Sequence, residues 1–231
     1  MRIMITGGAR SGKSSFAEQY AAALGQEGVY VATSQLYDEE MRERAALHRE
    51  QREASGFRWT TVEEPYDLAG VLSRWSRPEA EPLATSADGH APANPPSRPM
   101  SPISQPGGPD EDRASRPPVI LVDCLTLWLS NQMLKAGAPE PGWEDAVRQE
   151  TEGLLDALSA CRGTVLLVTN EVGGGIVPVY PLGRRFRDEA GRLNRQVAER
   201  CDQVFLVTAG IPVELKSLAF RLPGPDGPTA R

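Results

Sequence analysis

The sequence predicts an α/β fold in which a mostly parallel sheet carries helices on both faces. Short apolar runs of strand type alternate along the chain with longer segments rich in helix-forming residues. A glycine-rich loop joins the first run to the first helical segment, and 231 residues with 40% hydrophobic side chains suffice for one domain with a sizeable core. Alternating strands and helices favour parallel pairing, because each crossover helix packs back onto the sheet.

Composition narrows the classes of protein to consider. Lys and Arg number 25 against 31 Asp and Glu, a net charge of −6 that argues against a nucleic-acid-binding protein. The cysteines Cys124, Cys161 and Cys201 are widely spaced, so we expect neither a zinc site nor a disulfide framework, but reduced thiols in the cytoplasm. The amino terminus shows no signal-peptide pattern, and no apolar run approaches the ~20 residues of a membrane span.

The stretch Gly7–Ser14 fits the pattern G-x-x-x-x-G-K-S/T, which is typical of a phosphate-binding loop (P-loop). It lies between an apolar strand-like run, Arg2–Thr6, and the helix-forming segment Ser15–Leu24. Glycines let backbone N–H groups approach a polyphosphate, and the new helix points its positive end at the same anion. Lys13 is expected to reach the β and γ phosphates, and the Ser14 hydroxyl to ligate Mg²⁺. The alternative is a chance match in an ordinary turn.

The residues expected to contact the nucleotide phosphates are Gly7, Gly8, Ala9, Arg10, Ser11, Gly12, Lys13 and Ser14.

A second buried strand, Val29–Thr33, ends in the polar residues Thr33, Ser34 and Gln35. Ligands of open parallel sheets lie at the carboxyl ends of the strands, so these three residues are expected to face the same nucleotide. A simple strand-to-helix cap is the alternative.

The charged segment from Asp38 to Ser55 has good helix propensity and contains His48, one of two histidines in the chain. On composition alone, His48 is more typical of a surface histidine than of a catalytic one. An alternating strand follows over Phe57–Glu63, and a helix over Asp67–Trp75.

Residues 77–118 are crowded with Pro, Ser, Ala, Gly and Asp and keep no hydrophobic period. Such a composition cannot bury enough apolar surface to offset its ordering entropy, so a disordered insertion is predicted. A proline-rich docking site is the alternative. The tail 222–231 is also rich in Pro and Gly and is expected to be loose.

The run Val119–Asp123 restarts the core and has the form of a Walker B strand, in which Asp123 helps to hold Mg²⁺. Helices are expected over Leu125–Ala136 and Trp143–Cys161. Together, the phosphate-loop pattern and the Walker B strand predict a Mg²⁺-dependent P-loop enzyme acting on a purine nucleotide.

A further buried strand, Val165–Thr169, runs into the glycine-rich stretch Asn170–Pro178. A flexible turn at the carboxyl end of a strand suits a lid or a substrate loop, and a long connector is the alternative. A basic amphipathic helix is expected over Leu182–Cys201, followed by strands over Gln203–Thr208 and Pro212–Leu215.

Five motifs in order carry a family resemblance, of which the Thr169–Pro178 block is the most specific. They are Ile5–Ser14; Ala32–Ser34 with Glu40, Met41, Arg44 and His48; Trp59 with Thr61 and Glu63; Thr169–Pro178; and Phe186–Asp188 with Ala190–Arg192 and Asn194. Together they resemble the bifunctional adenosylcobinamide kinase/adenosylcobinamide-phosphate guanylyltransferase family of cobalamin biosynthesis. The resemblance runs from Ile3 to about Lys216, apart from the insertion.

This resemblance implies a RecA-like P-loop NTPase fold, two reactions at one site, and catalytic roles for His48 and Lys13. ATP or GTP phosphorylates the hydroxyl of adenosylcobinamide; GMP then passes from GTP to that phosphate through a GMP–histidine intermediate, and the matching histidine is His48. It also implies Mg²⁺ held by Ser14 and Asp123, and a homo-oligomer, typically a trimer. Beyond the P-loop, the nucleotide contacts carried over are Thr33, Ser34, Gln35, Arg49, Glu50, Arg52, Glu63 and Asp123.

We further hypothesise that Glu63 accepts hydrogen bonds from the N1–H and N2 amine of guanine. The chain departs from the family pattern at Ala45, where isoleucine is usual, and at Arg52–Ser55, where Arg-Pro is usual. A monofunctional P-loop kinase of a small molecule, with His48 a bystander, is the alternative enzyme. A non-catalytic nucleotide switch is a third reading, disfavoured by His48 and the Asn170–Pro178 block.

Overall fold

A computed structural model of the chain describes residues 1–35, 39–75 and 117–220. Some side chains of the second helix, that of His48 among them, lie outside this description. The predicted insertion 77–118, except Pro117 and Pro118, and the predicted tail 222–231 also lie outside the described residues.

Seven strands form one sheet in the order β3-β2-β4-β5-β1-β6-β7. All neighbouring pairs are parallel except β6 and β7, which are antiparallel. The predicted α/β class with a mostly parallel sheet is therefore confirmed. The strands are β1 (Arg2–Gly7), β2 (Glu27–Ala32), β3 (Arg58–Glu63), β4 (Val119–Asp123), β5 (Val165–Asn170), β6 (Gln203–Thr208) and β7 (Ile211–Glu214).

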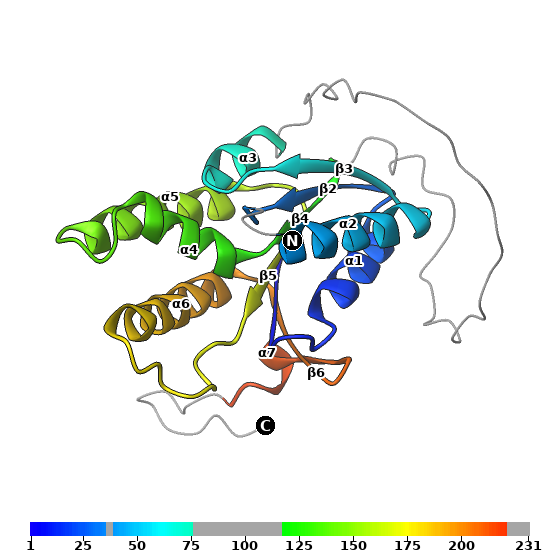
Figure 1. Ribbon diagram of the computed structural model, residues 1–231. Helices are drawn as coiled ribbons and strands as arrows, with labels where there is room; N and C mark the ends of the chain where they lie inside the picture. Colours follow the sequence, from blue (N-terminus) through cyan, green and yellow to red (C-terminus); the bar gives the residue numbers. More distant parts are fainter. Residues whose placement is uncertain (36–38, 76–116, 221–231) are drawn as a thin grey trace, which may run out of the picture.

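Helices cover both faces of the sheet, as predicted (Figure 1). The described helices are α1 (Lys13–Leu24), α2 (Glu39–Ala54), α3 (Leu68–Trp75), α4 (Leu125–Lys135), α5 (Trp143–Ala160), α6 (Pro181–Arg200) and α7 (Leu215–Leu218). Their bounds agree with the expected helices to within one or two residues, and the short α7 was not predicted.

The core is divided between the two faces by the alternation of side chains along each strand. On one face, Val29, Val31, Ile120 and Val122 pack against α3, α4, α5 and α6. On the other face, Ile3, Ile5 and Leu121 pack against α1, whose Ala17 and Ala21 let the helix approach closely. Strands buried on both sides are continuously apolar, which is why β4 and β5 were recognisable from sequence.

The described part of the chain contains no helix that is both long enough and apolar enough to span a bilayer.

Candidate active site

The carboxyl ends of the six parallel strands, β1 to β6, lie along one edge of the sheet. Gly7 at the end of β1 pairs with Asn170 of β5, and Ala32 of β2 pairs with both Glu63 of β3 and Asp123 of β4. Strand β5 lies between the P-loop strand and the strand of Asp123. The structure therefore brings the predicted phosphate loop, Asp123 and Glu63 to the same edge, with Asn170 between the first two.

The P-loop turns sharply into α1 through two residues of positive φ, Arg10 at 56° and Gly12 at 93°. The N–H of Ser11 donates to the carbonyl of Gly8 at 3.4 Å, which closes the turn. Because Gly12 has no side chain to cap α1, the first N–H groups of the helix remain available to an anion. The ammonium of Lys13 donates to the Gly8 carbonyl at 3.1 Å, so it already lies over the loop.

Close packing explains why the loop begins with glycine. A Cβ on Gly7 would lie 2.4 Å from the carbonyl oxygen of Val207 and 2.7 Å from Oγ of Ser11, both closer than side chains tolerate. From the other side, the N–H of Gly210 donates to the Ser11 carbonyl at 2.9 Å. The turn between β6 and β7 thus supports the loop, a contact that no local sequence signal predicted.

Asp123 is partly buried at the end of β4 and accepts a hydrogen bond on Oδ2 from the Tyr30 hydroxyl at 3.1 Å. Burial, and then the negative charge of Asp123, raises the pKa of Tyr30, so the phenol stays protonated and remains a donor. Sequence reasoning missed Tyr30, because its position inside a buried strand looks like ordinary core.

The donor set suits Mg²⁺ bound together with a nucleotide. Among the described residues no three His, Cys, Asp or Glu side chains cluster as a ready-made metal cage. Mg²⁺ is usually held by one or two protein oxygens plus phosphates and waters, and Asp123 and the partly exposed Ser14 offer oxygens of that kind.

Thr33 lies directly after β2, and its hydroxyl is already used inside the protein. It donates to the carbonyl of Cys124 and accepts from the Cys124 N–H, both at 2.8 Å, and is fully buried. Burial raises the pKa of the Cys124 thiol to about 12. The next two predicted residues, Ser34 and Gln35, are partly exposed, and the Gln35 amide donates to the Tyr66 hydroxyl at 2.6 Å.

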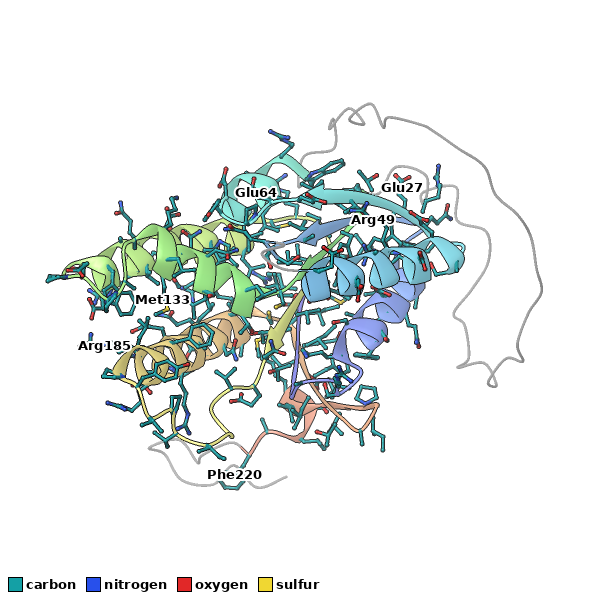
Figure 2. All side chains as sticks on the ribbon, in the orientation of Figure 1. Glu27, Arg49, Glu64, Met133, Arg185 and Phe220 are labelled. Atoms are coloured by element: carbon teal, nitrogen blue, oxygen red, sulfur yellow. The ribbon has the colours of Figure 1, made fainter. Side chains whose placement is uncertain are left out.

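Helix α2 carries His48 and meets the sheet at the same site. Arg49, its neighbour in the helix, pairs with Glu63 at 3.2 Å in an exposed ion pair, and Figure 2 labels Arg49 on this helix. Glu50 is exposed. Arg52 is instead buried, with its guanidinium stacked on Tyr30, so the structure separates these three predicted nucleotide contacts into two exposed side chains and one internal one.

The end of β5 is fixed by a buried polar network. The Thr169 hydroxyl donates to Oδ1 of Asn194 at 2.7 Å, and the Asn194 amide donates to the Asn170 carbonyl at 3.1 Å. Thr126 accepts from the Asn170 N–H at 2.7 Å. One residue later, the N–H of Glu171 donates to the Gly7 carbonyl at 3.0 Å, so the glycine-rich stretch starts beside the P-loop.

Apolar side chains are exposed on the loop that follows and near the carboxyl terminus. On the loop Ile176 is 98% and Val179 94% exposed. Near the carboxyl terminus Leu218 and Phe220 are also exposed, and Figure 2 labels Phe220 at the lower edge of the molecule.

The chain matches the CobU family, described as cobinamide kinase / cobinamide phosphate guanyltransferase, over residues 3–83 and 110–215. It belongs to this family. The predicted family and enzyme class are thereby confirmed, and the unmatched residues 84–109 fall inside the proline-rich stretch.

Curated relatives agree over nearly their whole length. The chain is 41% identical over 216 residues to the bifunctional adenosylcobalamin biosynthesis protein CobP of Pseudomonas aeruginosa, covering 94% of this chain and 98% of the relative. It is 35% identical over 223 residues to the bifunctional adenosylcobalamin biosynthesis protein CobU of Escherichia coli, covering 94% of this chain and 100% of the relative.

Among solved structures, the RadB recombinase is similar with a TM-score of 0.40 and 14% identity, over 89% of this chain and 73% of that one. A likeness at that level says nothing about function.

Proposed function

We propose that the protein phosphorylates adenosylcobinamide with ATP or GTP and then transfers GMP from GTP to the phosphorylated product. The products of the second reaction are adenosylcobinamide-GDP and pyrophosphate. The observation that carries the proposal is the convergence of the P-loop, Asp123 and the His48-bearing helix on one edge of the sheet. The family match supports both activities.

In the kinase step, the P-loop amides and Lys13 bind the phosphates of the nucleotide. Lys13 lies over the loop at the Gly8 carbonyl and exchanges that contact for phosphate oxygens. These groups neutralise the charge that develops as the γ-phosphoryl passes to the substrate hydroxyl. Mg²⁺ held by Ser14 and Asp123 would supply further positive charge at the β and γ phosphates.

In the guanylyl step, a neutral His48 imidazole attacks the α-phosphorus of GTP in line, and pyrophosphate leaves with the electrons of the broken P–O bond. The resulting phosphoramidate carries GMP on the histidine. An oxygen of adenosylcobinamide phosphate then attacks the same phosphorus, forms the pyrophosphate bond of the product, and releases the imidazole. Two easier displacements replace one difficult transfer.

The remaining nucleotide contacts are proposed at the sheet edge. Ser34 and Gln35 follow β2, and Arg49 and Glu50 follow His48 along α2 with exposed side chains. Thr33 is not among these contacts, because it is fully buried and its polar groups are already bound inside the protein. Its hydroxyl is bonded to Cys124, its N–H donates to the carbonyl of Asp123 at 3.2 Å, and its carbonyl accepts from the Asn131 amide at 2.8 Å. Arg52 is not among these contacts, because its side chain is buried.

Incubation of the purified protein with Mg²⁺ and α-³²P-labelled GTP, followed by denaturing electrophoresis, tests the guanylyl step. We expect label on the wild type and none on His48→Asn, and the label should be acid-labile and base-stable as a phosphoramidate is. No label on the wild type, with the fold intact and GTP bound, would leave a monofunctional kinase as the better description.

We also propose that the protein is a homo-oligomer, a trimer by family resemblance, and acts in the cytoplasm on a corrinoid substrate. The exposed side chains of Ile176, Val179, Leu218 and Phe220 support an interface between copies, since such groups are costly to leave in water.

A further inference from the structure

We propose that Arg52 is a positioning residue that holds the His48-bearing helix over the nucleotide site through a buried contact with Tyr30, without touching the nucleotide. This inference rests on the proposed function, because it concerns the placement of the histidine that receives GMP.

Burial sets Arg52 apart from the rest of α2. Arginine is almost never fully buried unless its charge is paired, yet Arg52 is only 5% exposed. Every other side chain of α2 that the structure describes is exposed: Glu39, Glu43, Ala46, Arg49, Glu50, Glu53 and Ala54. The ion pair of Arg49 with Glu63 lies in solvent, where such pairs stabilise little. Among the described side chains of α2, Arg52 is therefore the one that anchors the helix to the rest of the fold through buried contacts.

The guanidinium of Arg52 is held between two other elements. Its Cζ lies 3.6 Å from the centroid of the Tyr30 ring in β2, a cation–π contact. Its Nη1 lies 3.7 Å from Oε1 of Glu18 in α1. Burial raises the pKa of Glu18 and the charge of Arg52 lowers it, so the arginine compensates a carboxylate that would otherwise be poorly solvated. With 6% of its side chain exposed, Arg52 has almost no surface left for a ligand.

Both partners of Arg52, Tyr30 and Glu18, are connected to the groups proposed to bind the nucleotide and the metal. The hydroxyl of Tyr30 donates to Asp123 at 3.1 Å, so the ring under the guanidinium is also fixed by the proposed metal-binding acid. Glu18 is on α1, the helix whose first turn contains Lys13 and Ser14. Arg52 thus joins the helix of His48 to the P-loop helix and to the strand beside Asp123. A displacement of α2 would move His48 relative to the α-phosphorus while the phosphate loop stayed in place.

The test measures single-turnover labelling with α-³²P-GTP over a range of GTP concentrations, with three variants beside the wild type. Arg52→Met removes the charge and keeps an apolar stem, and Arg52→Lys keeps the charge but loses the planar stack. Glu53→Gln, an exposed change at the next residue, is the matched control. Phosphoryl transfer from γ-³²P-ATP to cobinamide is followed in parallel, and far-UV circular dichroism reports folding.

We expect Arg52→Met to lower the maximal labelling rate by about 100-fold, because a misplacement of about 1 Å has an effect of that size. The half-saturating GTP concentration and the kinase rate should change less than about threefold, the signature of an interaction that does not contribute to ground-state binding. Glu53→Gln should label as the wild type does.

Other results would overturn the inference. A rise in half-saturating GTP that accounts for the whole loss would make Arg52 a nucleotide contact, and an unchanged labelling rate would show that it positions nothing. If Arg52→Met does not fold, Arg52→Lys decides: slower labelling at unchanged half-saturating GTP supports the inference, and a wild-type rate overturns it. If the wild type itself takes no label, the proposed function fails and the inference with it, whereas equal labelling of wild type and Arg52 variants defeats the inference alone.

Discussion

At the scale of single residues, the structure separates exposed groups, which we propose face a nucleotide, from buried groups that hold the site together. Glu63 and Arg49 are paired but exposed, so either can exchange its partner for a ligand. Arg52 and Tyr30 are internal, although Arg52 is only three residues beyond Arg49. On a helix the two lie on the same side, one turn apart, and the exposure of each is decided by what the neighbouring strand places beneath it.

Glu63→Gln tests whether this carboxylate recognises guanine. A carboxylate can accept two hydrogen bonds from the N1–H and N2 amine, whereas adenine offers no such pair. We expect the Kd for GTP to rise about tenfold or more, as loss of a charged hydrogen bond should cost about 1.5–3 kcal/mol, with a much smaller change for ATP. Isothermal titration calorimetry measures both. Glu27→Gln, an exposed carboxylate at the amino end of β2, is the control, and equal weakening of GTP and ATP would contradict the assignment.

At the scale of elements, the end of β5 shows how a strand terminus is fixed beside a phosphate loop. Thr169 and Asn194 are buried polar residues whose side chains hydrogen-bond to one another, to Thr126 and to the backbone carbonyl of Asn170. This network orients the start of the Asn170–Pro178 stretch. The local sequence showed only a polar strand end, since Asn194 comes from α6, two dozen residues later.

Asn194→Ala should destabilise the protein, because it removes the acceptor of the buried Thr169 hydroxyl, which keeps only its contact with Thr126, and the side-chain donor to the partly buried Asn170 carbonyl. We expect a loss of about 1–3 kcal/mol in the free energy of unfolding, measured by urea denaturation. Arg195→Ala, at the neighbouring exposed position, should change it by less than about 0.5 kcal/mol. Equal stability of Asn194→Ala and the control would show that the network contributes little.

At the scale of the whole molecule, residues from opposite ends of the chain join the neighbouring strands β1 and β6. The Asp202 carboxylate, just before β6, accepts from the Arg2 backbone N–H at 2.7 Å and from its guanidinium at 3.3 Å. The hydrogen bond from the Arg2 N–H keeps the pKa of Asp202 below its usual value, and the guanidinium acts in the same direction. The Arg2–Asp202 contact therefore stabilises the fold only while Asp202 is ionised.

The Arg2–Asp202 contact predicts that the free energy of unfolding depends on pH. Since the folded pKa is below the unfolded value of about 3.9, the contribution is complete above that value and is lost as the pH falls through the folded pKa. Because both side chains are partly exposed, the contribution should be about 1 kcal/mol or less. Asp202→Asn should be less stable than the wild type at pH 7, and the difference should shrink in thermal melts as the pH is lowered below the unfolded value of about 3.9. A constant difference across that range would contradict the prediction.

Much of the fold was predictable from sequence because its signals are local. The β4 and β5 strands are uninterrupted apolar runs, and the P-loop pattern has its meaning only between a strand and a helix, both of which were visible. The antiparallel direction of β7 and the order of the strands were not predictable, because a short apolar run does not indicate which strand it pairs with.

The sequence by itself determined the class of fold, the phosphate loop, the acid at the end of β4 and the family, because each depends on residue type at short spacing. Only the tertiary structure decided that Arg52 is internal, that Tyr30 holds Asp123, and that Gly7 must lack a side chain beside Val207. These are contacts between segments far apart in the chain. Their strength depends on burial and distance, which arise only when the sheet has brought its strand ends together.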